Sequence, residues 1–132
     1  MPRKRPARLR RVQEIAPVVR IPGVSPRVAR ALDRLELPEL NSQEIAVAYR
    51  QWITVCQQPR RTLSREHNDW SGLIGPVARD QLERAIQALP PQLSRQLQAA
   101  LTPWDQRFLE KTLPDPTRNP SGPWWWQRQG VR

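Results

Sequence analysis

Three side chains capable of acid–base or metal chemistry lie close together in this chain, namely Glu66, His67 and Asp69. His67 is the single histidine, and Cys56 is the single cysteine. A zinc site takes about four ligands, mostly Cys and His, and the chain has no second Cys or His to complete one. We therefore predict no metal site, and we interpret residues 64–70 as a polar helix start or a surface loop.

Cys56 could act as a nucleophile only with a base such as His67 beside its thiol. The cysteine instead falls in the middle of the apolar face of a predicted helix, where we expect a small core residue. The glycines at positions 72 and 75 lack the Lys and Ser/Thr that a phosphate-binding loop requires. We therefore predict no bound cofactor and no enzymatic activity.

The charge of the N-terminal segment is the strongest chemical signal in the chain. Residues 1–24 hold seven basic residues and one acidic residue, a net charge of +6, whereas residues 25–112 hold 12 basic and 10 acidic residues, a net charge of +2. Arginine makes bidentate hydrogen bonds to phosphate, and a block of like charges often serves as an interaction arm. We therefore predict an extended arm that binds nucleic acid through Arg3, Lys4, Arg5, Arg8, Arg10 and Arg11. The alternatives are an acidic protein surface, an anionic membrane, or a solubilising tail without a dedicated partner.

Three consecutive tryptophans, Trp124, Trp125 and Trp126, lie in a proline-rich tail that spans residues 113–132. Each indole can bury about 150–250 Å², and three exposed rings would favour aggregation, so we expect the triplet to dock. In one interpretation it folds back and caps the core of the helical domain. In a second it anchors in a groove of a protein partner or a second copy, and in a third it stacks on bases with help from Arg128. The triplet is our predicted partner-binding site.

Residues 41–57 are predicted to form the central helix. Asn41 is suited to the N-cap, and Glu44 follows three residues later as in a capping box. Apolar residues recur at helical spacing on one face, namely Ile45, Ala48, Tyr49, Trp52, Ile53 and Cys56. A helix that is apolar on most sides is usually buried among others, so the pattern indicates the centre of a helical bundle.

Proline and cap signals predict the remaining helices. Pro26 starts one whose arginines lie opposite an apolar stripe, Pro76 starts a second, and Pro91 starts a third. Thr102 and Pro103 signal a further, separate start. On the helix after Pro76, we expect the polar residues to face water and to form the i, i+4 pairs Arg79–Glu83 and Asp80–Arg84. These polar residues are Arg79, Asp80, Glu83, Arg84 and Gln87.

We predict an all-α fold, a bundle of four to six short helices over residues 25–112, flanked by the arm (residues 1–24) and the tail (residues 113–132). Turns at proline rather than glycine, and the lack of a helix face with a basic reading surface, argue against a helix-turn-helix. No run approaches the ~18 apolar residues of a membrane span, and Pro17 and Pro22 interrupt the apolar segment that a signal peptide would need. We expect a cytoplasmic protein.

Two functions remain open at this level. The leading prediction is a small non-catalytic protein associated with nucleic acid through its arginine-rich arm. The alternative is a protein–protein adaptor or assembly subunit that docks through its C-terminal Trp segment, with the arm on an acidic partner.

Overall fold

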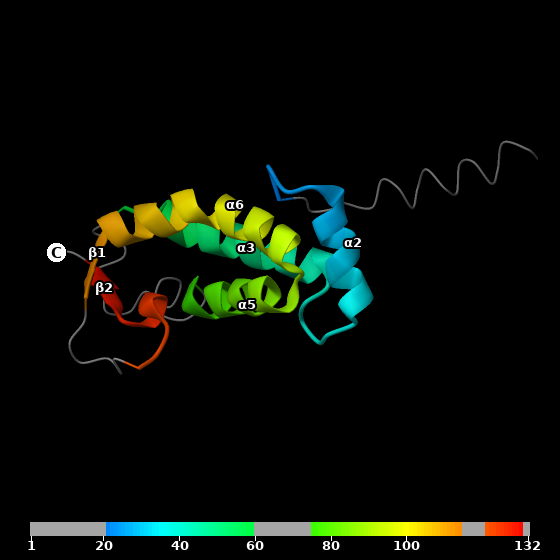
Figure 1. The fold of residues 1–132 in the computed structure, drawn as a ribbon. Helices are drawn as coiled ribbons and strands as arrows, with labels where there is room; N and C mark the ends of the chain where they lie inside the picture. Colours follow the sequence, from blue (N-terminus) through cyan, green and yellow to red (C-terminus); the bar gives the residue numbers. More distant parts are fainter. Residues whose placement is uncertain (1–20, 60–74, 115–120, 131–132) are drawn as a thin grey trace, which may run out of the picture.

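The computed structural model describes residues 21–59, 75–114 and 121–130 of the chain. Its helices are α2 (Pro26–Leu35), α3 (Ser42–Cys56), α5 (Gly75–Ala88) and α6 (Pro91–Glu110), followed by strand β1 (Thr112–Pro114), the 3₁₀ helix η2 (Trp124–Trp126) and strand β2 (Arg128–Gly130) (Figure 1). Helices dominate the described residues, which confirms the all-α class. The predicted arm up to residue 20 and the predicted helix start at residues 64–70 lie outside the described residues.

Helix α3 lies at the centre of the bundle, where it contacts α2, α5 and α6. In Figure 1, α3, α5 and α6 run side by side, and α2 crosses one end of them. The backbone N–H of Glu44 donates to Asn41 Oδ1 at 2.8 Å, so the predicted N-cap is confirmed. Of the predicted apolar face, Ile53 is half-buried, and the others are buried, namely Ile45, Ala48, Tyr49, Trp52 and Cys56.

One carboxylate fixes the turn between α2 and α3. Ser42 donates to Asp33 twice, from its backbone N–H at 2.8 Å and from its hydroxyl at 3.0 Å. Between these two helices the chain reverses direction at Glu36 and Glu39, whose φ values of 49° and 65° lie in the left-handed region. The Asp33 carboxylate is therefore hydrogen-bonded to the first residue of α3.

Helix α6 runs without a break through Thr102 and Pro103, so the prediction of a separate helix there is wrong. The Thr102 hydroxyl is not an N-cap, because it donates to the carbonyl of Gln98, one turn earlier, at 2.9 Å. Buried residues continue in phase on both sides of the proline, namely Leu93, Leu97, Leu101, Asp105 and Phe108. Burial of this face outweighs the cost of a proline inside a helix, which is about 3 kcal/mol.

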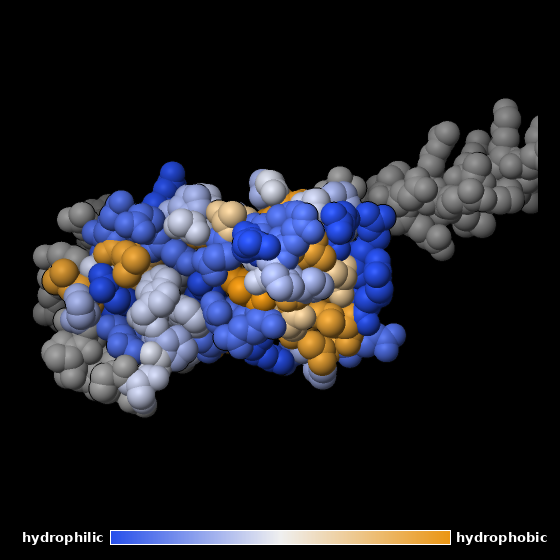
Figure 2. Space-filling view, in the orientation of Figure 1, coloured by the Kyte–Doolittle hydropathy of each residue, from blue (hydrophilic) through white to orange (hydrophobic). Residues whose placement is uncertain are grey.

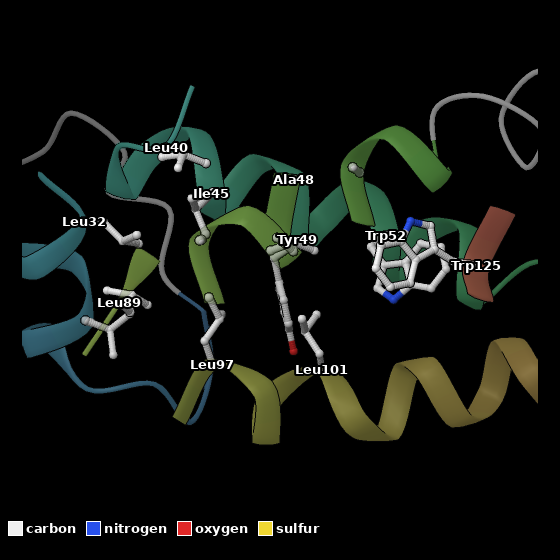
Figure 3. Packing of buried hydrophobic residues seen from close by; sticks show 14 of the residues in the cluster. Leu32, Leu40, Ile45, Ala48, Tyr49, Trp52, Leu89, Leu97, Leu101 and Trp125 are labelled. Atoms are coloured by element: carbon white, nitrogen blue, oxygen red, sulfur yellow. The ribbon is translucent and has the colours of Figure 1, made fainter. Parts of the chain in front are cut away.

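The C-terminal segment closes one end of the core. Trp125 is 5 % exposed, and Figure 3 shows it at the same end of the core as Trp52, away from Leu32. Strands β1 and β2 pair antiparallel, with Thr112 opposite Gly130, and this pairing ties the tail to the end of α6. The triplet thus packs on its own bundle, as in the first of the three interpretations. A role for it in binding a partner stays a prediction.

Candidate functional site

The arm residues predicted to bind nucleic acid lie outside the described residues, and so does His67; these arm residues are Arg3, Lys4, Arg5, Arg8, Arg10 and Arg11. Cys56 is free and fully buried. Burial raises the pKa of its thiol, and the negative charge of Asp105 adds to that effect. Cys56 is therefore the core residue that we expected.

Across residues 21–59, 75–114 and 121–130, no three His, Cys, Asp or Glu side chains are grouped so that they could hold a metal ion. None of the helices in these ranges combines the length and apolar content that a bilayer span requires.

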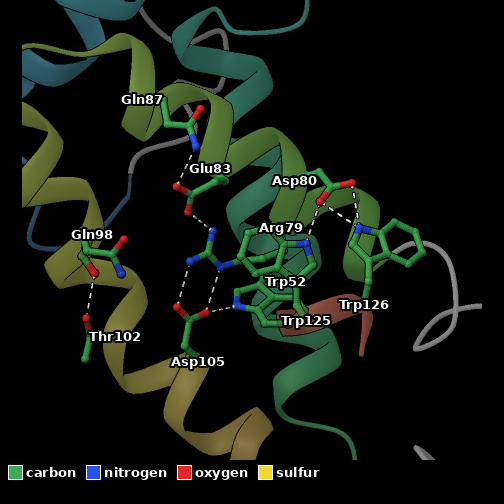
Figure 4. Close-up of polar contacts among 10 residues, drawn as sticks. All are labelled: Trp52, Arg79, Asp80, Glu83, Gln87, Gln98, Thr102, Asp105, Trp125 and Trp126. Carbon is green, nitrogen blue, oxygen red and sulfur yellow. Dashed lines mark hydrogen bonds and ion pairs between the residues drawn. The ribbon is translucent and has the colours of Figure 1, made fainter. Parts of the chain in front are cut away.

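Arg79 is 2 % exposed, so the prediction that it faces water is wrong. Its Nε and Nη2 donate to the two carboxylate oxygens of Asp105 at 3.1 and 3.0 Å, and its Nη1 donates to Glu83 at 3.2 Å. Asp105 also accepts a hydrogen bond from Trp52 Nε1 at 2.8 Å (Figure 4). A buried guanidinium requires such acceptors, because an unpaired charge is costly away from water. The predicted pair Arg79–Glu83 is confirmed.

Asp80 does not form the predicted pair with Arg84. Arg84 contacts Glu39 instead, at 3.4 Å on the surface. Asp80 accepts hydrogen bonds from the indole N–H groups of Trp125 at 2.6 Å and Trp126 at 2.9 Å (Figure 4). The predicted pair with Arg84 is wrong because indole N–H groups of the C-terminal segment bind this carboxylate instead. Spacing along the helix cannot reveal that segment.

These contacts form one cluster, which we call the Trp–Arg cluster and which comprises Trp52, Arg79, Asp80, Asp105, Trp125 and Trp126. The Arg79 guanidinium lies 4.4 Å from the centroid of the Trp125 ring, a cation–π contact. The cluster joins α3, α5, α6 and the C-terminal segment. Asp80 and Asp105 each accept N–H hydrogen bonds from other elements of the fold, so the cluster holds these elements together.

A second site lies on α2. Arg27, Arg30 and Arg34 are exposed at the i, i+3, i+7 spacing of one helix face, opposite the apolar stripe as predicted. Together with Ala31 and three residues around the start of α6, they line a pocket of about 450 Å³, which we call the arginine pocket. These three residues are Pro90, which precedes α6, and Gln92 and Leu93 of its first turn. The three arginines thus lie on the face that the sequence predicted, and Figure 2 shows hydrophilic residues along the side of the molecule that α2 forms.

The electrostatics of the arginine pocket favour an anion. No acidic residue lines it, and among the described residues none of its three arginines forms an ion pair. The acidic residue of the same helix, Asp33, is hydrogen-bonded to Ser42 instead. Three cations within two helical turns repel one another, so an anion bound among them would relieve that repulsion.

An apolar hollow of about 440 Å³ lies beside α2 as well. Its walls include Val24 from the preceding segment and Val28 and Leu32 from the apolar stripe of α2. Arg30 lines both this hollow and the arginine pocket. Arg30 is therefore shared by the two concavities.

Only part of the arginine pocket could have been found in the sequence. The spacing of three arginines on one helix was visible there, but their approach to α6 was not. This approach is supported by the backbone N–H of Ser25, which donates to Gln96 Oε1 of α6 at 3.2 Å. Comparison of the chain with protein-family models, with curated proteins and with solved structures gave no match.

Proposed function

We propose that this protein binds nucleic acid without catalysing a reaction, and that its basic arm and its arginine pocket act together. The arm would contribute Arg3, Lys4, Arg5, Arg8, Arg10 and Arg11. The observation that carries the proposal is the pocket, in which three arginines without an ion-pair partner among the described residues line one concavity. The planar guanidinium group matches phosphate in a bidentate geometry.

The two basic elements follow each other directly along the chain. The segment of residues 1–24, with seven basic residues and one acidic residue, precedes α2, which begins at Pro26. An arm alone neutralises phosphates without holding them at a defined position on the protein. Arginines on a packed helix would fix the register of the bound strand, since phosphate contacts position a protein on nucleic acid but carry no sequence information. We therefore propose binding that is independent of sequence.

The proposal is tested by fluorescence anisotropy of a labelled oligonucleotide across a salt series. The full chain is compared with a deletion of residues 1–20 and with the triple variant Arg27→Gln, Arg30→Gln and Arg34→Gln. The deletion stops at residue 20 because Ile21 packs against the core. A protein with six to ten phosphate contacts loses about 10³- to 10⁵-fold in affinity between about 50 and 200 mM salt, and we expect a loss of that size for the full chain.

Each variant has a distinct expected outcome. The deletion should weaken binding and flatten the salt dependence, and the triple variant should reduce the slope of log affinity against log salt by about 2 to 3. Arg50→Gln, which removes an exposed charge on α3, is the control and should leave the slope almost unchanged. Circular dichroism checks that each variant is folded. If the full chain does not bind the oligonucleotide at about 150 mM salt, the proposal is wrong. If the triple variant keeps the salt slope of the full chain, the arginine pocket makes no phosphate contact.

Docking of a protein partner through Trp124, Trp125 and Trp126 has weaker support. Trp125 is 5 % exposed, and the N–H groups of Trp125 and Trp126 are already bonded to Asp80. A partner would have to replace these contacts. The cytoplasmic location likewise stays a prediction.

A further inference from the structure

We infer that the arginine pocket and the apolar hollow together bind single-stranded nucleic acid, with a phosphate in the pocket and an unstacked base in the hollow. This inference deepens the proposed function and rests on it. It names the class of nucleic acid, which the salt dependence of phosphate binding does not reveal.

The positions of the two concavities would let consecutive parts of one nucleic-acid strand bind to them. Val28 and Leu32, which line only the hollow, are rotated by about 100–160° around the axis of α2 from Arg27 and Arg34, which line only the pocket. Arg30 lines both. A strand that crosses the exposed face of α2 at Arg30 would therefore meet guanidinium groups on one side and an apolar wall on the other.

The hollow has the chemistry that an unstacked base requires. Its apolar walls can cover the face of a base, and arginine guanidinium planes stack on exposed bases in complexes with single strands, as Arg30 could here.

A duplex cannot use both concavities. Its bases are stacked and paired, so a base reaches an apolar hollow only after it has been extruded from the helix at an energetic cost. Its phosphates can still meet the arginine pocket. We therefore expect a duplex to bind through phosphate contacts alone, and more weakly than a single strand of the same sequence.

The test uses the full chain, a labelled single-stranded DNA of mixed sequence, its RNA counterpart and the DNA duplex. Ala29→Leu fills the hollow, which Ala29 lines, without changing any charge. Ala99→Leu, at an exposed position of α6, is the matched control.

We expect the wild-type chain to prefer at least one single strand over the duplex by about tenfold, since the loss of one stacking contact lowers affinity by about this factor or more. Ala29→Leu should lower single-strand affinity about tenfold with an unchanged salt slope, because no phosphate contact is lost. Its duplex affinity, and both affinities of Ala99→Leu, should match the wild type.

Two results would overturn the inference while leaving the proposed function intact. The first is equal affinity for both single strands and the duplex. The second is a folded Ala29→Leu variant, verified by circular dichroism, that binds single strands as Ala99→Leu does. Absence of binding to every probe at about 150 mM salt would overturn both the inference and the proposed function.

Discussion

Replacing Asp105 by alanine removes the carboxylate that joins three helices of the bundle. Asp105 accepts hydrogen bonds from Trp52 Nε1 at 2.8 Å and from Arg79 at 3.0 and 3.1 Å. In the variant Arg79, which is 2 % exposed, keeps Glu83 as its remaining carboxylate partner. Removing one member of a buried ion pair costs about 3–5 kcal/mol, because the other charge stays buried without its counter-charge. A domain of this size has a free energy of unfolding of about 5–15 kcal/mol, so the variant should be close to unfolding.

The assay is urea denaturation followed by far-ultraviolet circular dichroism, because tryptophan fluorescence would report the local change at Trp52 as well as unfolding. Asp105→Asn keeps one acceptor but removes the charge, so it should cost less, about 1–3 kcal/mol. The decisive comparison is the double variant Arg79→Met with Asp105→Leu. Replacing both members of a buried pair by apolar residues is often neutral or stabilising, so we expect this double variant to be more stable than Asp105→Ala.

Two outcomes would refute the reasoning. If Asp105→Ala lowers the free energy of unfolding by less than about 1 kcal/mol, the buried guanidinium is not as dependent on this carboxylate as the magnitudes for buried pairs require. If the double variant is no more stable than Asp105→Ala, the cost comes from lost packing and not from the unpaired charge. A matched surface control is Arg84→Ala, whose ion pair is exposed and should contribute less than about 1 kcal/mol.

Two further predictions concern Asp80 and Cys56. Asp80→Ala removes the acceptor of the Trp125 and Trp126 indole N–H groups. It should loosen the C-terminal segment by about 1–2 kcal/mol, detected as faster proteolysis after residue 114 and a red-shifted tryptophan emission; unchanged proteolysis relative to Arg84→Ala would contradict this. Burial raises the pKa of the Cys56 thiol above its ordinary value of 9.0, so the folded state keeps a proton that the unfolded chain loses at higher pH. The free energy of unfolding should therefore fall above about pH 9, by about 1.4 kcal/mol per pH unit from this group. Cys56→Ala should remove that part of the slope in urea titrations, and equal slopes in the two proteins would show that Cys56 is not responsible.

Local features of the chain were sufficient to predict most of the helices. The Asn41 cap, the proline at position 26 and the apolar spacing of residues 41–57 each act within about one or two helical turns. None of them depends on which segment packs on which. The charge of the arm is equally independent of the fold, because it follows from composition alone. For these features the sequence contains the whole physical cause.

The tertiary structure decided which polar groups are buried and which face water. Arg79 and Asp105 are 26 positions apart, and Asp80 and Trp125 are 45 apart, so no local spacing connects them. A guanidinium on a helix surface meets water or a carboxylate according to the segment that covers it, and here the C-terminal segment covers α5. Pro103 shows the same dependence, because continued burial of α6 overrides its local start signal. The arginine pocket also forms only where α2 and α6 meet. Desolvation and hydrogen bonding depend on neighbours in space, and these are set by packing rather than by distance along the chain.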